Sequence, residues 1–274
     1  MQVCYLDKKK HESITLLQLT DTHLYADPAG NLLGVNTLDS FHAVLEAVDD
    51  ANIAFDAIVA TGDISQDHSD VSYQRFADGI TRWTQPCYWL PGNHDYQPEM
   101  ESILNAAQLH RGNIVNLGEY WQMVMLDSQV PGVPHGELSD SQFEMLENAL
   151  SNAGEKHILV LLHHHPIAAG SAWLDQHQLH NNERFWEIVS AYPHVKGVVC
   201  GHIHQALDYE YQGVRVMASP STCIQFMPDS DNFALDLQNP GWRTLTLNAD
   251  GSMDSGVFRI EGVIFSPDLQ SGGY

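Results

Sequence analysis

The stretch ITLLQLTDTH, from Ile14 to His23, combines the two features that decide the fold. Its first six residues are mostly apolar and predict a buried β-strand over Ile14–Leu19. A carboxylate, Asp21, and an imidazole, His23, follow that strand directly. Ligands of open α/β sheets bind beyond the carboxyl ends of the strands. This stretch therefore predicts both a strand of such a sheet and one side of a binding site.

Four further apolar runs end in side chains of the same kinds. They are Ala57–Ala60 before Gly62-Asp63, Cys87–Leu90 before Gly92-Asn93-His94-Asp95, Ile158–Leu162 before His163-His164-His165-Pro166, and Val195–Cys200 before Gly201-His202-Ile203-His204. We expect an extended backbone in D-x-H and H-x-H, because residues two apart then face the same side. We expect the glycines to permit sharp turns. Each motif alone is common in surface loops, but all five in order predict one shared site.

The spacing of the elements predicts an α/β architecture. A further strand is expected at Met123–Leu126, and the amphipathic helices are expected at Thr37–Ala51, Ser69–Trp83, Ser139–Ala149 and Asn181–Ala191. After His204 the pattern changes to turns and short strands, at Ala206–Tyr211, Val214–Ala218, Arg243–Leu247 and Gly256–Ile260. We expect these later strands to form a second sheet of their own. One domain over residues 14–265 is predicted, between an N-terminal arm (1–13) that includes the solvated Lys8–Lys10 run and a C-terminal tail (266–274).

The acidic composition limits the classes of molecule that the protein is expected to bind. The chain has 12 basic and 35 acidic residues and a formal charge of −23. Such a surface repels nucleic acids and anionic membranes, because phosphate backbones are bound by clustered Lys and Arg. No run approaches the roughly 20 apolar residues of a membrane span. The N-terminus does not resemble a secretory signal, and the four cysteines are widely spaced, with Cys87 and Cys200 expected as buried free thiols. These features favour a cytoplasmic protein.

The carboxylate and imidazole side chains at the strand ends favour a metal-binding site. A substrate phosphate would need positive charge that so acidic a chain does not supply, so we expect bound metal to supply it. Carboxylate and imidazole ligands together suit Mn, Fe or Zn better than Ca or Mg.

The order D-x-H, G-D, G-N-H-D, H-H-x-P, G-H-x-H resembles the calcineurin-like metallophosphoesterase superfamily. Four longer segments resemble the bacterial class III 3′,5′-cyclic AMP phosphodiesterases: Leu33–Thr37, Val133–Ser139, Ser171–His177 and Pro240–Leu245. The resemblance runs from about Ile14 to the tail. It implies a single-domain α/β fold in which a sandwich of two β-sheets is flanked by helices and holds two metal ions.

The resemblance also implies the metal ligands. Asp21, His23, Asp63 and His204 would bind the first metal, and Asp63, Asn93, His163 and His202 the second, with Asp63 bridging. One choice stays open, because a shift of one residue would make His164 the ligand in place of His163. The expected metals are two divalent or trivalent ions per chain, Fe or Mn, with Zn or Co as alternatives.

The implied reaction is hydrolysis of 3′,5′-cyclic AMP to 5′-AMP, which would lower intracellular cyclic AMP. Two metals about 3.5–4 Å apart can generate a bridging hydroxide that attacks phosphorus in line. Asp63 and His94 are the expected catalytic residues, with His94 giving a proton to the leaving oxygen. The side chains expected to contact the substrate are His23, Asp63, Asn93, His94, His163 and His204.

The sequence leaves open which residue orients His94, which aromatic residue contacts a base, and two alternative functions. Either Asp95 or Asp67 could orient His94, and the position where this superfamily often has an orienting Asp is occupied by Gln66. Of the aromatic residues, Trp83, Trp89, Trp121 and Trp186 are expected in the core, and Trp173, Phe226 and Trp242 are candidates for stacking on a base. The alternative functions are a broader metallophosphodiesterase or phosphatase and a non-catalytic binding protein on the same fold. Oligomeric state is not predicted.

Overall fold

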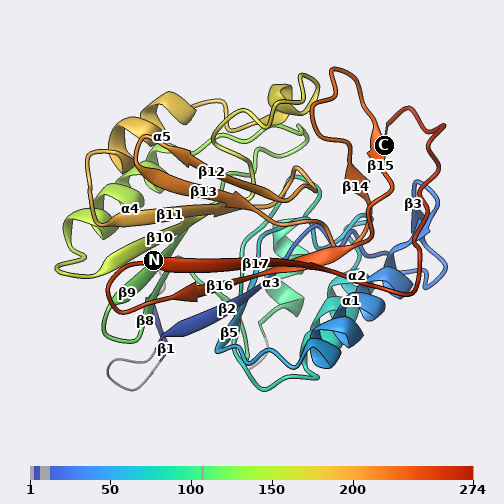
Figure 1. Ribbon diagram of the computed structural model, residues 1–274, viewed down its shortest axis with the longest axis horizontal. Helices are drawn as coiled ribbons and strands as arrows, with labels where there is room; N and C mark the ends of the chain where they lie inside the picture. The colour runs from blue at the N-terminus through green and yellow to red at the C-terminus, as the bar shows by residue number, and fades with distance from the viewer. Residues whose placement is uncertain (1–2, 7–12, 106–107, 274) are drawn as a thin grey trace.

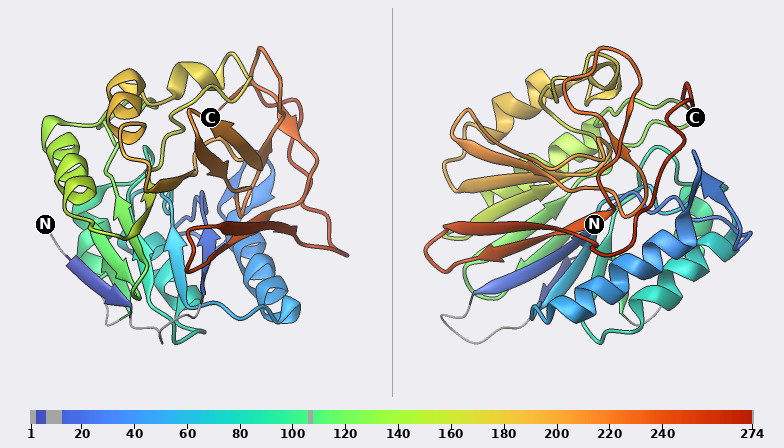
Figure 2. Two further views of the ribbon diagram at one scale, coloured as in Figure 1. Left: turned by 60° about the vertical axis from the view of Figure 1, so that its left-hand side comes forward. Right: turned by 45° about the vertical axis from the view of Figure 1, so that its right-hand side comes forward.

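Two β-sheets packed face to face form the centre of the molecule, and helices cover their outer faces (Figure 1). This is a computed structural model that describes residues 3–6, 13–105 and 108–273. The turned views show the two sheets as stacked layers with helices on opposite sides (Figure 2). The predicted α/β sandwich is thus confirmed. None of the helices in the described ranges is long and apolar enough to cross a membrane.

The two large sheets are both mixed. The seven-stranded sheet runs in the order β1 (Val3–Leu6), β8 (Ile114–Leu117), β9 (Trp121–Met125), β10 (His157–Leu161), β11 (Val195–Cys200), β13 (Val214–Ala218) and β12 (Leu207–Tyr211). The six-stranded sheet runs in the order β17 (Met253–Arg259), β16 (Gly241–Leu247), β2 (Ile14–Leu19), β5 (Ala57–Ala60), β6 (Cys87–Trp89) and β7 (Leu109–Arg111). Two small hairpins join β3 (Asn31–Leu32) to β4 (Val35–Asn36) and β14 (Gln225–Phe226) to β15 (Leu235–Asp236).

The four predicted helices are present, and the structure adds a helix and a 3₁₀ turn that were not predicted. The predicted helices are α1 (Thr37–Ala51), α2 (Asp70–Ile80), α4 (Asp140–Ser151) and α5 (Asn182–Val189), and the additions are α3 (Gln97–Ile103) and the 3₁₀ turn η1 (Leu174–His177). Ser69 and Ser139 cap α2 and α4, because each hydroxyl accepts a hydrogen bond from the backbone N–H three residues later. Each of these helices therefore begins one residue after its predicted start.

Alternation along the strands divides the core into three layers. In β2, Leu16 packs between the sheets and Leu17 packs toward α1 and α2. In β10, Leu159 faces the other sheet and Val160 faces α4 and α5. Successive strand residues point to opposite faces. Strands buried on both faces therefore need continuous apolar runs, which is the pattern that makes β2, β5, β10 and β11 recognisable in the sequence.

The expectation that the later strands form their own sheet is wrong. β13 pairs with β11 in the seven-stranded sheet, and β12 pairs with β13. β16 pairs antiparallel with β2 in the six-stranded sheet, and β17 pairs with β16. An unpaired strand edge exposes backbone N–H and C=O groups. The later strands extend both early sheets at such edges, instead of building a sheet from each other alone.

The two ends of the chain pack onto this frame. Within the expected N-terminal arm, Val3–Leu6 forms β1 and pairs in parallel with β8. The Lys8–Lys10 run lies outside the described residues. Near the other end, the backbone N–H of Asp268 donates to the carbonyl of Leu33 at 2.7 Å, so the tail lies against the β3–β4 hairpin. The proposed boundaries of arm, domain and tail remain a prediction.

One buried cation connects the two sheets. Arg243 of β16 is 2% exposed, and its guanidinium donates to the carbonyl oxygens of Ala218 and Leu207 at 2.9 Å. Those carbonyls belong to β13 and β12 of the other sheet. Both of these bonds come from Nη2, and Nη1 donates to Ser255 Oγ on β17. Burial lowers the pKa of Arg243 to about 10, so the side chain stays charged at neutral pH.

We predict that Arg243→Met lowers the free energy of unfolding by about 2–4 kcal/mol, because it leaves buried carbonyl oxygens without donors. Urea denaturation measures this loss. Arg82→Met is the control, since Arg82 is exposed and its ion pair with Asp49 lies at the surface. A surface pair contributes about 0–1 kcal/mol. Equal losses in the two variants would contradict the role assigned to Arg243.

Candidate metal centre

Five loops bring the predicted ligands together, and each loop follows the carboxyl end of a strand. Three belong to the six-stranded sheet and follow β2, β5 and β6; two belong to the seven-stranded sheet and follow β10 and β11. The loops carry Asp21 and His23, Asp63, Asn93, His163, and His202 with His204. The site therefore lies where the two sheets meet at one end of the sandwich.

One group of donor atoms forms around the loop after β2. His204 Nε2 lies 3.3 Å from Asp21 Oδ1 and 3.2 Å from His23 Nε2. His23 Nε2 also lies 3.9 Å from Asp63 Oδ2. The donor atoms of Asp21, His23 and His204 all fall within 4.8 Å of one another. These distances are short enough for the four side chains to share one cation.

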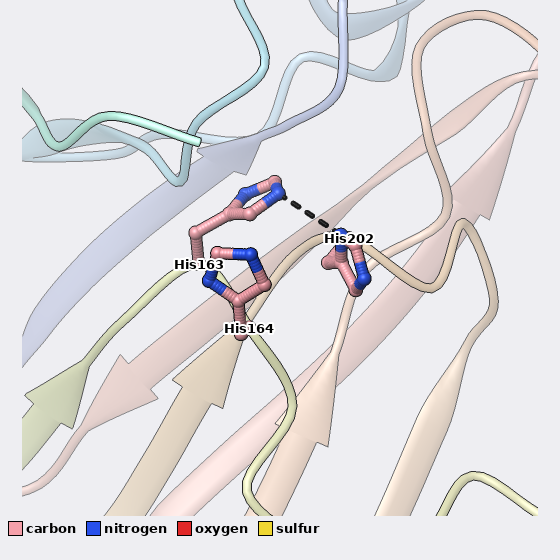
Figure 3. A group of neighbouring side chains, drawn as sticks. All are labelled: His163, His164 and His202. Carbon is pink, nitrogen blue, oxygen red and sulfur yellow. Dashed lines mark hydrogen bonds between the residues drawn. The ribbon is translucent and has the colours of Figure 1, made fainter. Parts of the chain in front are cut away.

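A second group forms around His163. Its Nε2 lies 3.1 Å from Asn93 Oδ1, 3.3 Å from Asp63 Oδ2 and 3.2 Å from His202 Nδ1. Figure 3 shows this last contact as a dashed line between one nitrogen of His163 and one of His202, whose rings meet edge-on at 71°. Asp63 Oδ2 is thus close to a histidine of each group, which is the position a bridging carboxylate requires.

The two adjacent candidates for one ligand position, His163 and His164, have different surroundings. His163 Nε2 is surrounded by the three other donors of its group. The ring of His164 is turned to the opposite loop, with Nδ1 2.8 Å from Ser128 Oγ and with its ring against Gly136. His164 still lies within the neighbourhood of His163 and His202. The hydrogen-bond geometry favours His163 as the ligand.

Three of the histidines are oriented through the ring nitrogen that faces away from the site. His23 Nδ1 lies 2.6 Å from Gln66 Oε1, His163 Nδ1 lies 2.7 Å from the carbonyl of Thr61, and His204 Nδ1 lies 2.9 Å from the carbonyl of Ile224. Metal-ligating histidines commonly donate their second N–H in this way, which fixes the tautomer and the ring. The two backbone partners have no side-chain signature, so the sequence could not reveal them.

Gln66 has a defined place in this arrangement. Its amide oxygen accepts from His23 and holds that ring, so the departure from the superfamily pattern lies beside a predicted ligand. The two carboxylates considered as partners of His94 are bound elsewhere. Asp95 accepts from the backbone N–H groups of Ile64, Ser65 and Gly92, and Asp67 accepts from Ala26 N and from Ser69. Both brace the loops around the site.

His94 lies at the edge of the donor groups. Its ring is edge-on to that of His23 with the centroids 5.1 Å apart, and its backbone N–H donates to Asp63 Oδ1 at 2.8 Å. A ring nitrogen of His94 falls within 4.8 Å of donor atoms of His23 and Asp63. Burial lowers the pKa of His94, while the charge of Asp63 opposes that shift. The side chain is therefore placed to act on a group bound at the site.

The extended backbone expected in D-x-H and H-x-H is wrong. The residues that carry the donors in these two motifs, and Asp63, have left-handed conformations: φ is 53° at Asp21, 45° at His23, 52° at Asp63, 69° at His202 and 50° at His204. The left-handed region costs a non-glycine residue about 1–2 kcal/mol. Strain of this kind concentrates at functional sites, where surrounding contacts maintain it. Tight turning, and not strand alternation, directs these side chains inward.

Two of the glycines serve different needs. Gly62 has a φ of 98°, and so supplies the sharp turn that was expected. Gly92 is required for close approach, because an added Cβ would lie 2.1 Å from Asp63 Oδ1 and 2.5 Å from the Asp63 backbone nitrogen. The loop after β6 can therefore press against the carboxylate of Asp63 only without a side chain at this position.

The electrostatics of the site favour bound cations. Asp21 and Asp63 are 0% and 1% exposed, and their partners among the described residues are imidazoles, backbone N–H groups and one hydroxyl. Burial would raise the pKa of each carboxyl group, but the neighbouring histidines lower it overall. A buried carboxylate is costly without a compensating positive charge. Two acids and several imidazoles with few external partners form a donor set that fits Mn, Fe or Zn.

Comparison with known proteins agrees with this geometry. The model of the calcineurin-like phosphoesterase family matches residues 14–206. The chain therefore belongs to this family of metallophosphoesterases. It is 55% identical over 274 residues, covering 100% of both chains, to a Vibrio vulnificus protein named 3′,5′-cyclic adenosine monophosphate phosphodiesterase CpdA. It is 53% identical, over 95% of both chains, to the protein of the same name from Escherichia coli strain K12.

The fold is also found in distant solved structures. A dimetal phosphatase from Danio rerio superimposes with a TM-score of 0.60 and 14% identity, covering 90% of this chain and 99% of that one. At this identity the likeness shows the shared sandwich fold alone.

Proposed function

We propose that this chain is a dinuclear-metal phosphodiesterase that hydrolyses 3′,5′-cyclic AMP to 5′-AMP. The observation that carries the proposal is the pair of donor groups joined at Asp63 Oδ2. Two relatives that match 100% and 95% of the chain, at 55% and 53% identity, are named as phosphodiesterases of that substrate. The reaction would lower intracellular cyclic AMP, and the four free cysteines fit a reducing cytoplasm.

We assign the metal ligands from the two groups. Asp21, His23, Asp63 and His204 would hold one ion, and Asp63, Asn93, His163 and His202 the other. Fe and Mn are the proposed metals, because the set mixes carboxylate, amide and imidazole donors. Bound ions would supply Lewis-acid charge for a phosphoryl group and lower the pKa of a water molecule toward about 7.

The side chains around the ions have separate tasks. Asp63 would contribute to holding both ions, since one of its oxygens faces both donor groups and the other accepts from the backbone of His94. His94 would donate a proton to the leaving 3′-oxygen, and a bound phosphate anion would favour the protonated ring. His23, Asn93, His94, His163 and His204, with Asp63, line the place where the phosphate would bind.

We predict that His163→Ala reduces the bound metal from two ions per chain to about one, because it removes the nitrogen around which the second group is arranged. His164→Ala is the matched control and should retain two ions, since its Nδ1 contacts Ser128. Inductively coupled plasma mass spectrometry of the Mn-loaded proteins measures the content. Loss of an ion in His164→Ala with retention in His163→Ala would reverse the assignment.

We predict that His94→Gln keeps both ions but lowers kcat for cyclic AMP by about 10²–10⁴-fold, the usual contribution of a positioned acid. The loss should be much smaller for an aryl diester, whose leaving group needs no proton. Steady-state kinetics on both substrates, with metal analysis, makes the comparison. Equal losses on the two substrates would show that His94 is not the proton donor.

The proposal itself is tested with the purified chain loaded with Mn²⁺ or Fe²⁺ and given 3′,5′-cyclic AMP. The expected product is 5′-AMP, identified by chromatography against 3′-AMP, and Asp63→Ala should abolish both turnover and metal binding. Good turnover of bis(p-nitrophenyl) phosphate with none of cyclic AMP would favour the broader phosphodiesterase. Two bound ions with no turnover of either diester would favour the non-catalytic alternative.

A further inference from the structure

A cavity of about 220 Å³ opens directly beside the proposed metal site. One end is lined by Asn93, His94 and His202, which belong to the site or border it. Its volume is below the roughly 300–1,000 Å³ of pockets for drug-sized ligands. The space therefore suits one small group attached to a phosphate bound at the site.

Three aromatic rings line the other end of the cavity. They are Trp173, from the turn before η1, and Phe226 and Phe233, from the hairpin of β14 and β15. Trp173 meets Phe226 at 84° and Phe233 at 68°, with centroids 4.9 and 5.0 Å apart. These are edge contacts and not parallel stacks. The rings therefore enclose the space without covering one another face to face.

The aromatic end is joined to the metal end through one stacked pair. Phe226 lies parallel to the imidazole of His204, with an interplanar angle of 15° and centroids 4.3 Å apart. Phe226 is 2% exposed, whereas Trp173 and Phe233 are only half-buried. At the aromatic end, Trp173 and Phe233 are thus the side chains that a ligand could contact, and Phe226 forms the floor of the cavity.

The charge of the lining excludes a second anion at the aromatic end. No Lys or Arg is among the residues that line the cavity, as far as the described residues go. A chain of net charge −23 also gives an anion no general attraction. The ligand group that fits here is therefore neutral, and the aromatic lining favours an aromatic one.

We propose that this cavity is the nucleobase subsite, in which a purine lies against Trp173 and Phe233 while its phosphate is held at the metals. This inference rests on the proposed phosphodiesterase function and specifies which residues recognise the substrate beyond its phosphate. Of the three aromatic candidates for stacking, Trp242 is excluded, since it is buried against Phe258 in the core beside α1 and α2. Trp173 is the main specificity-determining residue.

The test measures binding and turnover separately. Isothermal titration calorimetry of the Mn-loaded protein is carried out with 5′-AMP and with ribose 5-phosphate, which has the same phosphate but no base. We expect 5′-AMP to bind at least tenfold more tightly, the scale of one base–aromatic stack. In Trp173→Leu the affinity for 5′-AMP should fall roughly tenfold, while that for ribose 5-phosphate stays the same.

Kinetics provide the second measurement. Trp173→Leu should raise KM for cyclic AMP about tenfold with kcat within about twofold of wild type, because the base contact is made equally in the ground and transition states. Trp83→Leu is the matched control: Trp83 is also half-buried but lies beside Phe55, outside the cavity lining. Phe233→Leu makes the same test if Trp173→Leu fails to fold.

Two outcomes would overturn the subsite. One is equal binding of 5′-AMP and ribose 5-phosphate by the wild-type protein. The other is a parallel loss of both ligands in Trp173→Leu, which would assign the residue to support of the metal loops. Failure of the proposed function looks different: the protein would prefer 5′-AMP over ribose 5-phosphate in binding and yet not hydrolyse cyclic AMP.

Discussion

The carboxylate of Asp63 is the contact on which the rest of this structure depends. It is almost completely buried at the end of the sandwich, with one oxygen close to His23 and His163 and the other bonded to the backbone of His94. A buried negative charge is tolerated only where positive or hydrogen-bonding groups surround it. Loops of both sheets supply those groups. The two sheets must therefore pack with their carboxyl ends together, and the absence of a side chain at Gly92 lets the loops close around the carboxylate.

Such closure requires backbone conformations that are unfavourable in isolation. Left-handed residues follow β2, β5 and β11, and each costs about 1–2 kcal/mol. Hydrogen bonds between the loops offset that cost: Asp21 N donates to Gly62 O, His23 N to Asp63 O, and Leu24 N to Ile64 O, at 2.9–3.0 Å. The loops after β2 and β5 are thus held together like a short parallel ladder. This backbone pairing holds Asp21, His23 and Asp63 in the positions from which their side chains face the site.

The sequence predicts the five central strands and their chemical ends because doubly buried strands need unbroken apolar runs and the polar residues that follow have no structural reason to be there. It does not predict where β12, β13, β16 and β17 pair, because short alternating strands fit any open sheet edge. In the site, too, the sequence predicts some features and not others. Side-chain donors are visible as motifs, but the conformation of Asp21 and the carbonyl partners of the histidines arise from tertiary contacts. The choice between His163 and His164 likewise depends on the orientation of their rings, which tertiary contacts determine.

The residues proposed to bind the metals and the residues proposed to bind the base come from different parts of the fold. The donor groups come from the ends of the central strands, within the residues that the family model matches, so they indicate phosphoester chemistry and nothing narrower. The aromatic end of the cavity comes from elsewhere: Trp173 from the turn before η1, and Phe226 and Phe233 from a two-stranded hairpin outside both sheets. Phe226 belongs to the buried core cluster, whereas Trp173 and Phe233 are only half-buried against it. Because Phe226 stacks on His204, however, the hairpin is held at a fixed distance from the metal site. Contacts with a neutral base would therefore contribute binding energy in a chain whose strong negative charge opposes an anionic substrate. Substitutions at the residues proposed to bind the base could then change substrate selectivity while the metal-binding loops stay in place.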